Sequence, residues 1–201
     1  VLSRLIMGTR ISLMIVAVSM IVGTIVGTGL GLIAGFKGGI IDEIIMRAVD
    51  IWFGIPFILV ALIIAVVVGP GLTTMMGLLA LASFGGFVRQ VRAEVLSLKE
   101  RDYVALARVA GASTTRILMV HILPGVSSTV MVIATMSTGG LILAESFLSF
   151  VGAGVPPPTP TWGAMVADGR GYMRDAWWIT VVPGVAILIT VMSLNFLGDW
   201  L

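Results

Sequence analysis

The sequence predicts an all-α protein that folds as a polytopic bundle of transmembrane helices, and three observations support this prediction. Of the 201 residues, 58% are hydrophobic and only 11% are charged, whereas a soluble domain usually has about 25% charged residues. The mean hydropathy is +1.13. Several charge-free stretches approach or exceed the length of about 20 residues that a helix needs to cross a bilayer. So few charges cannot cover a water-exposed surface.

The charge-free stretches predict five spans within one transmembrane domain, residues 1–201. The Gly69-Pro70-Gly71 turn separates the second span from the third. Pro56 falls in the first turns of the second span, where a kink is tolerated, and Pro183 breaks the last span early. In order along the chain, the expected spans cover residues 11–36, 51–68, 72–88, 117–144 and 176–198.

Two segments beside these spans have amphipathic patterns. Val1–Arg10 is expected to be an interfacial lead-in, and Lys37–Asp50 a short amphipathic helix that lies along the membrane surface. Inside the first span, Gly23, Gly27 and Gly31 form a small-xxx-small row, which favours close contact with another helix. The alternative is a glycine-rich span without a specific partner.

The basic residues are distributed unequally between the two sides of this topology. The side with more Lys and Arg faces the cytoplasm, so residues 89–116 are expected to form a cytoplasmic loop. The proline-rich residues 145–175 then form an external loop. The richer side has Lys37, Arg47, Arg89, Arg92, Lys99, Arg101, Arg108 and Arg116, and the other side has Arg4, Arg10, Arg170 and Arg174.

The cytoplasmic loop has the pattern of two short helices around a glycine. Asp102 is expected to be the N-cap of a helix that runs to about Ala110, Gly111 its left-handed C′ residue, and Ser113 the cap of the next helix. Small alanines with arginines around them suit insertion into a cleft of a partner protein. The alternatives are an ordinary loop with solvated charges, or a DNA-reading motif, which the tether between two spans disfavours.

The run from Asp102 to Ser113, followed by Arg116-Ile-Leu and His121-Ile-Leu-Pro-Gly, resembles the EAA loop of ABC importer permeases. More narrowly, the chain resembles the second permease subunit of the dipeptide/oligopeptide/nickel branch. The resemblance covers essentially the whole chain. Other matching segments are Leu2-Ser-Arg-Leu-Ile, Gly8-Thr-Arg-Ile-Ser-Leu, Met46-Arg-Ala-Val-Asp, the run from Phe147 to Gly163, Ala176-Trp-Trp and Asn195-Phe-Leu-Gly-Asp.

Two features depart from the pattern of this family. The Glu-Ala-Ala of the family falls on Ala105-Leu106-Ala107, so the glutamate is missing, while Gly111 and Pro124 match. The family has six spans, of which five are found here. Because the chain also opens without Met, we expect it to be the interior of a longer protein.

The resemblance implies a type I ABC importer permease-like fold in a bacterial or archaeal plasma (inner) membrane. It implies import of di- or oligopeptides, or alternatively of nickel or another small solute. The implied partners are a homologous second permease, two cytoplasmic ATP-binding subunits that hold ATP and Mg, an extracytoplasmic substrate-binding protein and membrane lipid. No cofactor on this chain and no nucleic acid are implied. The residues expected to couple to the ATPase are Arg101, Asp102, Tyr103, Ala105, Leu106, Ala107, Arg108, Gly111, Ala112 and Ser113.

Candidates for a translocation path lie on the fourth span: Ser137, Gly139, Gly140 and Glu145. The first three would line a path or simply allow close packing, and the residues alone do not separate these two roles. A carboxylate near the membrane is a functional candidate by default. The alternative for Glu145 is a salt-bridged or hydrated position at interface level.

Other conspicuous residues are explained by structural roles and need no functional one. A lone His121 in a chain without Cys is a poor metal site, so a structural hydrogen bond is expected there. Trp162, Trp177 and Trp178 are expected to form an outer interfacial belt. The sequence predicts neither catalytic residues nor a metal site, which disfavours a membrane enzyme. A self-sufficient secondary transporter or channel usually has ionisable residues at the bilayer midplane, and the five spans lack them there.

Overall fold

The computed structural model describes residues 1–200, and every regular element in that range is helical. A π-helical turn, Ile117–Ile122, joins α6 to α7, and a short 3-10 turn, Arg170–Tyr172, follows α8. The α-helices are α1 Leu2–Lys37, α2 Gly39–Gly54, α3 Phe57–Val68, α4 Leu72–Leu98, α5 Asp102–Val109, α6 Thr114–Arg116, α7 Leu123–Phe150, α8 Trp162–Gly169 and α9 Trp178–Trp200. The predicted all-α fold is therefore confirmed.

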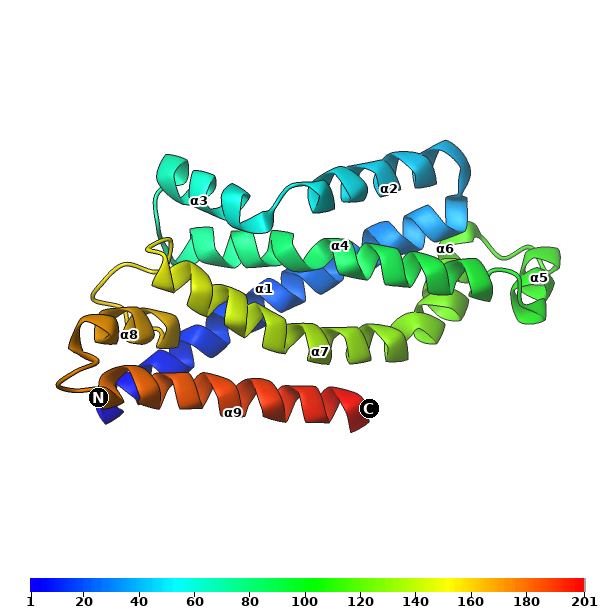
Figure 1. The fold of residues 1–201 in the computed structure, drawn as a ribbon. Helices are drawn as coiled ribbons and strands as arrows, with labels where there is room; N and C mark the ends of the chain where they lie inside the picture. The colour runs from blue at the N-terminus through cyan, green and yellow to red at the C-terminus, as the bar shows by residue number, and fades with distance from the viewer. Residues whose placement is uncertain (201) are drawn as a thin grey trace.

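The long helices run side by side, and the short ones lie at the two ends of the bundle (Figure 1). Within residues 1–200, 4 helices are long and apolar enough to cross a membrane: α1, α4, the continuous stretch Thr114–Phe150 and α9. The bent pair of α2 and α3 raises the number to 5. The N-terminus and α8 lie at one end, hereafter the α8 end, and α5 lies at the opposite end, the α5 end (Figure 1).

The prediction that Lys37–Asp50 lies along the membrane surface is wrong, because α2 runs back alongside α4 (Figure 1). Early in α2, Asp42 accepts a hydrogen bond of 2.6 Å from Arg92. Further along α2, a side chain at Gly85 would collide with Phe53, at 2.8 Å. Asp42 and Asp50, two of the charges that suggested a surface helix, are paired with arginines of α4, which lets this polar helix pack into the bundle.

The expected single span at residues 51–68 is also corrected, since it is divided between two helices. Ile55 is extended, with φ −100° and ψ 127°, and α3 begins directly after Pro56. Proline removes a backbone donor and disfavours the helical conformation at the residue before it. The axes of α2 and α3 differ by 84°, so Pro56 breaks the helix rather than kinking it.

Several helices extend beyond the limits expected from the sequence. α1 includes the expected lead-in, α4 continues past Val88 to Leu98, and α7 continues through Glu145 to Phe150. Pro183 lies inside α9 without ending it. Charged residues indicate where the hydrocarbon core of the membrane ends, but they are a poor indicator of where a helix ends. A helix can continue into water when its charges find partners.

The glycine row of α1 packs directly against α4, which confirms the prediction of close helix contact. A Cβ atom on Gly27 would lie 2.5 Å from the carbonyl oxygen of Phe84, and one on Gly31 would lie 2.9 Å from that of Val88. The row continues at Gly35, where a Cβ would meet Val95 at 2.8 Å. Small residues at this spacing let two backbones approach closely.

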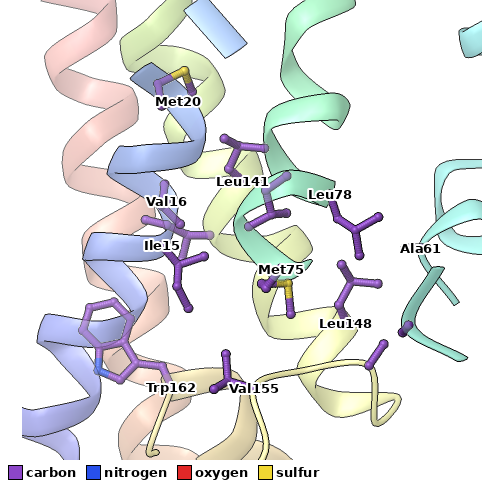
Figure 2. Packing of buried hydrophobic residues seen from close by; sticks show 14 of the residues in the cluster. Ile15, Val16, Met20, Ala61, Met75, Leu78, Leu141, Leu148, Val155 and Trp162 are labelled. Carbon is purple, nitrogen blue, oxygen red and sulfur yellow. The ribbon is translucent and has the colours of Figure 1, made fainter. Parts of the chain in front are cut away.

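The buried side chains form two clusters within the described residues. The larger one lies toward the α8 end and includes Ile15, Met75, Leu148 and Trp162 (Figure 2). The smaller cluster joins α1, α4, α5 and the start of α7; it contains Leu32, Val91, Val95, Val104, Ile117, Ile122 and Val126. The larger cluster corrects the expected interfacial position of Trp162, which is 3% exposed because α8 folds onto the bundle.

Candidate functional site

The helix α5 begins one residue earlier than the sequence suggests. Arg101 is extended, with φ −73° and ψ 145°, and occupies the N-cap position without a capping side-chain hydrogen bond. Asp102, predicted as the N-cap, is instead the first helical residue. Its carboxylate lies in the first turn, where the helix dipole favours negative charge.

The end of α5 is a Schellman turn, which confirms Gly111 as the left-handed C′ residue. The φ angle of Gly111 is +78°. The Gly111 N–H donates to the carbonyl of Arg108, and the Ala112 N–H donates to that of Ala107, both at 3.0 Å. This pair of bonds satisfies carbonyls at the end of the helix and reverses the chain.

The return from α5 to the bundle is short and helical. The Ser113 hydroxyl accepts a hydrogen bond of 3.3 Å from the Arg116 N–H, which confirms the predicted cap. The next turn is π-helical and contains His121, whose ring lies 6.4 Å from the Tyr103 ring between centroids. Thus the observed contact of His121 is aromatic, and the expected hydrogen bond is not seen among residues 1–200.

One face of α5 attaches it to the bundle. Val104 is 0% exposed and lies in the smaller cluster, where it joins α5 to Ile117 and Ile122 at the start of α7 and to residues of α1 and α4. Ala107 packs against the same cluster. This cluster therefore packs α5 against the ends of α1, α4 and α7.

The opposite face of α5 exposes large apolar side chains. Tyr103, Leu106 and Val109 are 43%, 68% and 87% exposed, and their spacing places them along one side of the helix; we call them the α5 ridge. A shallow hollow beside it is lined by Tyr103, Leu106, Ala107, Ala110, Gly111, Ala112, Arg116 and His121. The prediction from the sequence stressed the alanines and omitted Val109. The signal for Val109 was the apolar spacing of three residues from Tyr103 to Leu106 to Val109 within a polar run.

The basic residues near α5 differ from one another in their contacts. The guanidinium carbon of Arg108 lies 5.5 Å from the centroid of the Phe36 ring at the end of α1. The Lys99 ammonium donates a hydrogen bond of 3.1 Å to the carbonyl of Gly35, where a cation is favoured by the helix terminus. Arg101 is exposed. Arg108 therefore holds α5 to α1, in addition to bordering the exposed face.

The structure does not bring the candidate path residues together on one face of α7. A Cβ on Gly139 would meet the side chains of Asn195 and Val191 at 3.1 and 3.2 Å, so this glycine allows close packing with α9. Gly140 is exposed with open space around it, and Ser137 is half-buried. Of these three, Gly140 and Ser137 are accessible from outside the chain.

The sequence suggested that Glu145 lies at the start of a loop, at interface level. The structure places it elsewhere. It is 0% exposed within α7. Its carboxyl group accepts hydrogen bonds from the Ser149 hydroxyl at 3.0 Å and from the Ser146 hydroxyl at 3.5 Å. No salt bridge to it occurs within residues 1–200, which corrects the salt-bridged interpretation. The continuation of α7 and the fold of α8 over it explain the difference.

A bundle of helices long and apolar enough to cross a membrane, with a short anchored helix exposed at one end, is the arrangement of a multi-pass membrane protein. Residues 27–201 match the model of the family "Binding-protein-dependent transport system inner membrane component". The chain belongs to this family and is a multi-pass protein of the inner membrane. The resemblance that the sequence showed is therefore confirmed.

Similar proteins with curated names come from the same kind of system. The chain is 42% identical over 200 residues to the di/tripeptide transport system permease protein DppC of Pseudomonas aeruginosa, covering 100% of this chain and 66% of the relative. It is 42% identical over 201 residues to the glutathione transport system permease protein GsiD of Pectobacterium atrosepticum, covering 100% and 67%. The chain thus spans about two thirds of the length of these relatives.

Among solved structures, the fold is similar to that of the MetNI methionine ABC transporter in an inward-facing conformation. The TM-score is 0.81 at 23% identity, and the match covers 98% of this chain and 94% of the other. At this identity the likeness supports the fold alone, which is that of a type I importer permease.

Proposed function

We propose that this chain is a permease subunit of an ATP-driven importer and that it forms part of the path for di- and oligopeptides. The observation that carries the proposal is the geometry of α5, which is anchored by Val104 and presents the α5 ridge outward. An apolar ridge on a helix at the membrane surface suits a groove on a partner protein. The partner proposed is a cytoplasmic ATPase subunit, and the chain itself is non-catalytic.

In this mechanism α5 is the coupling helix. Two ATP-binding subunits hold ATP and Mg, and their closure pushes on the α5 ridge. The push reaches the smaller cluster through Val104 and is transmitted along the continuous helix Thr114–Phe150. Because the cluster also contains residues of α1 and α4, the permease responds as a unit and alternates its access between the two sides.

The distribution of basic residues supports the orientation. The α5 end is the side of the bundle with more Lys and Arg residues. The positive-inside rule assigns this richer side to the cytoplasm. The α8 end then faces outward, where an extracytoplasmic binding protein delivers the substrate. A homologous second permease completes the path, since this bundle is only one of its two walls.

The names of the relatives support short peptides as the substrate class. One relative is named for di- and tripeptides and another for glutathione, which is itself a modified tripeptide. The alternative within the family, import of nickel or another small solute, would be recognised from the ligand that the co-purified binding protein carries.

The test is substitution of the ridge in the complete importer. Leu106→Asp places a charge at the centre of the proposed contact, and loss of a central apolar contact costs about 2 kcal/mol or more, roughly a 30-fold loss of affinity. We expect peptide uptake to fall by at least tenfold while the chain still inserts. Glu100→Gln, at the exposed turn before α5, is the control.

Normal uptake by Leu106→Asp would contradict the proposal. Transport by the purified chain alone in liposomes, driven by an ion gradient without ATPase subunits, would favour a secondary transporter instead.

A further inference from the structure

A hollow at the α8 end has no role in the coupling mechanism above, and we call it the α8 hollow. It has a volume of about 220 Å³. Several parts of the chain meet around it: the start of α1 at Arg4, the turn before α4 at Pro70, the end of α7 at Ser149, the loop after α7, and α8. The hollow therefore lies where the ends of several helices come together.

The walls of the α8 hollow are held in place by neighbouring structure. Residues 156–158 are all proline and form part of the wall, and proline restricts the backbone to few conformations. Val155, beside them, is 7% exposed and packs in the larger cluster (Figure 2). A Cβ on Gly154 would lie 2.6 Å from the Cα of Ser149, so the loop lies directly on α7. Fixed walls spare a small ligand the cost of ordering the protein.

Two opposite charges lie at the α8 hollow, on Arg4 of α1 and Asp168 of α8. A guanidinium nitrogen of Arg4 lies 3.3 Å from a carboxylate oxygen of Asp168, and the two side chains are 60% and 55% exposed. Neither has another ion-pair partner within residues 1–200. An exposed ion pair adds little to stability. A ligand that brings its own pair of opposite charges can therefore replace it.

The size and the charges of the α8 hollow together indicate a class of ligand. Pockets for drug-sized ligands have about 300–1,000 Å³, so a volume of about 220 Å³ suits a smaller molecule. The other lining residues are mainly glycine, alanine and proline, which offer a small apolar surface. A dipeptide has a cationic amino group at one end, an anionic carboxylate at the other and short side chains, so it matches each of these features.

We infer that the α8 hollow is a receiving site for a short zwitterionic peptide, whose amino group binds Asp168 and whose carboxylate binds Arg4. The inference rests on the proposed function, since a binding protein at the α8 end would release its peptide beside this hollow. Because both charges are exposed to water, binding there is weak. Weak binding lets the peptide leave again and move on through the importer.

The experiment measures binding of dialanine to the complete importer in lipid nanodiscs, without the binding protein, by ligand-observed NMR. Two blocked forms are the matched probes: N-acetyl-dialanine lacks the cationic amino group, and dialanine amide lacks the carboxylate. We expect the dissociation constant of each blocked form to be about fivefold higher than that of dialanine, because each loses one exposed ion pair.

Two substitutions test the two ends of the peptide separately. Arg4→Gln should remove the preference for dialanine over its amide and keep the preference over the acetylated form. Asp168→Asn should do the reverse. Arg170→Gln is the matched control, because this exposed arginine lies at the same end, with its guanidinium carbon 5.1 Å from the centroid of the Phe150 ring, and does not line the hollow. Both preferences should persist in the control.

A third substitution tests the hollow apart from its charges. Ala167→Leu adds apolar bulk to the wall and leaves Arg4 and Asp168 in place. It should weaken the binding of dialanine and of both blocked forms by a similar factor. Unchanged binding of dialanine by this variant would contradict the inference.

Absence of saturable dialanine binding by the wild-type importer, or equal binding of the three probes, would also overturn the inference. Loss of both preferences in each single variant would show that the ion pair only ties α1 to α8, and unchanged preferences would place the binding site elsewhere; either result overturns it. Failure of the proposed function is a separate result: the importer, supplied with its binding protein and ATP, would not take up dialanine.

Discussion

The two short helices α5 and α8 have the same length, 8 residues, and lie at opposite ends of the bundle (Figure 1). In α5, Val104 is the buried residue, and the α5 ridge points outward. In α8, Trp162 and Met165 are each 3% exposed, and the Trp162 N–H donates a hydrogen bond of 3.0 Å to the Ser12 hydroxyl of α1.

This difference supports the proposal that the α5 end docks into a groove of a partner protein. α5 is attached by one face and leaves apolar area uncovered, which a soluble partner would bury. α8 has already buried its apolar face inside the chain. The helix α7 connects the two, since it begins after α5 and packs near its other end against α8, where a Cβ on Gly163 would lie 2.5 Å from the Cα of Ser146. A movement that starts at the exposed end therefore reaches an end that is rigidly assembled.

The same substitution, glycine to alanine, tests this comparison at both ends. At the α8 end, Gly163→Ala introduces a methyl group 2.5 Å from the Cα of Ser146, where the backbone has to shift. Overpacking of this kind costs about 1–3 kcal/mol. We expect a clear fall in the thermal unfolding temperature of the purified complex. An unchanged unfolding temperature would show that α8 is not held as tightly as the contacts indicate.

At the α5 end, the cost of Gly111→Ala has a different physical cause and is smaller. The added methyl group meets open space, but the φ angle of +78° is unfavourable for an L-residue, at a cost of about 1–2 kcal/mol. We expect the direction of α5 to change, so that peptide-dependent ATP hydrolysis falls while the unfolding temperature of the bundle moves little. Full coupling in this variant would argue against a requirement for the turn.

Gly77→Ala is the control for both changes. Gly77 lies inside α4 with open space around a Cβ atom, and alanine is favoured over glycine in a helix by about 0.5–1 kcal/mol. Neither coupling nor stability should therefore decrease.

Much of this architecture follows from local chemistry. The charge-free stretches identify the membrane helices, and Gly111 and Ser113 predict the turn after α5, because left-handed backbone and helix caps each require few residue types. These features depend on neighbours in sequence, so a single sequence is enough to predict them.

Other features depend on distant partners and are not predictable in this way. α2 has the pattern of a surface helix, yet Asp42 pairs with Arg92 of α4. Glu145 reads as an interface residue, yet it is 0% exposed, and α8 packs directly on α7 at the neighbouring Ser146. In both cases another element makes the decisive contact, so the polar residue alone predicts exposure wrongly.

The central claim is that the α5 ridge contacts an ATPase subunit while the α8 end receives the binding protein. The most direct measurement places a photo-cross-linking amino acid at Val109, 87% exposed, or at Tyr172, 59% exposed, in the assembled importer. We predict that the probe at position 109 cross-links the ATPase subunit and that the probe at position 172 cross-links the binding protein. Cross-linking of the ATPase subunit from position 172, or its absence from position 109, would contradict the account.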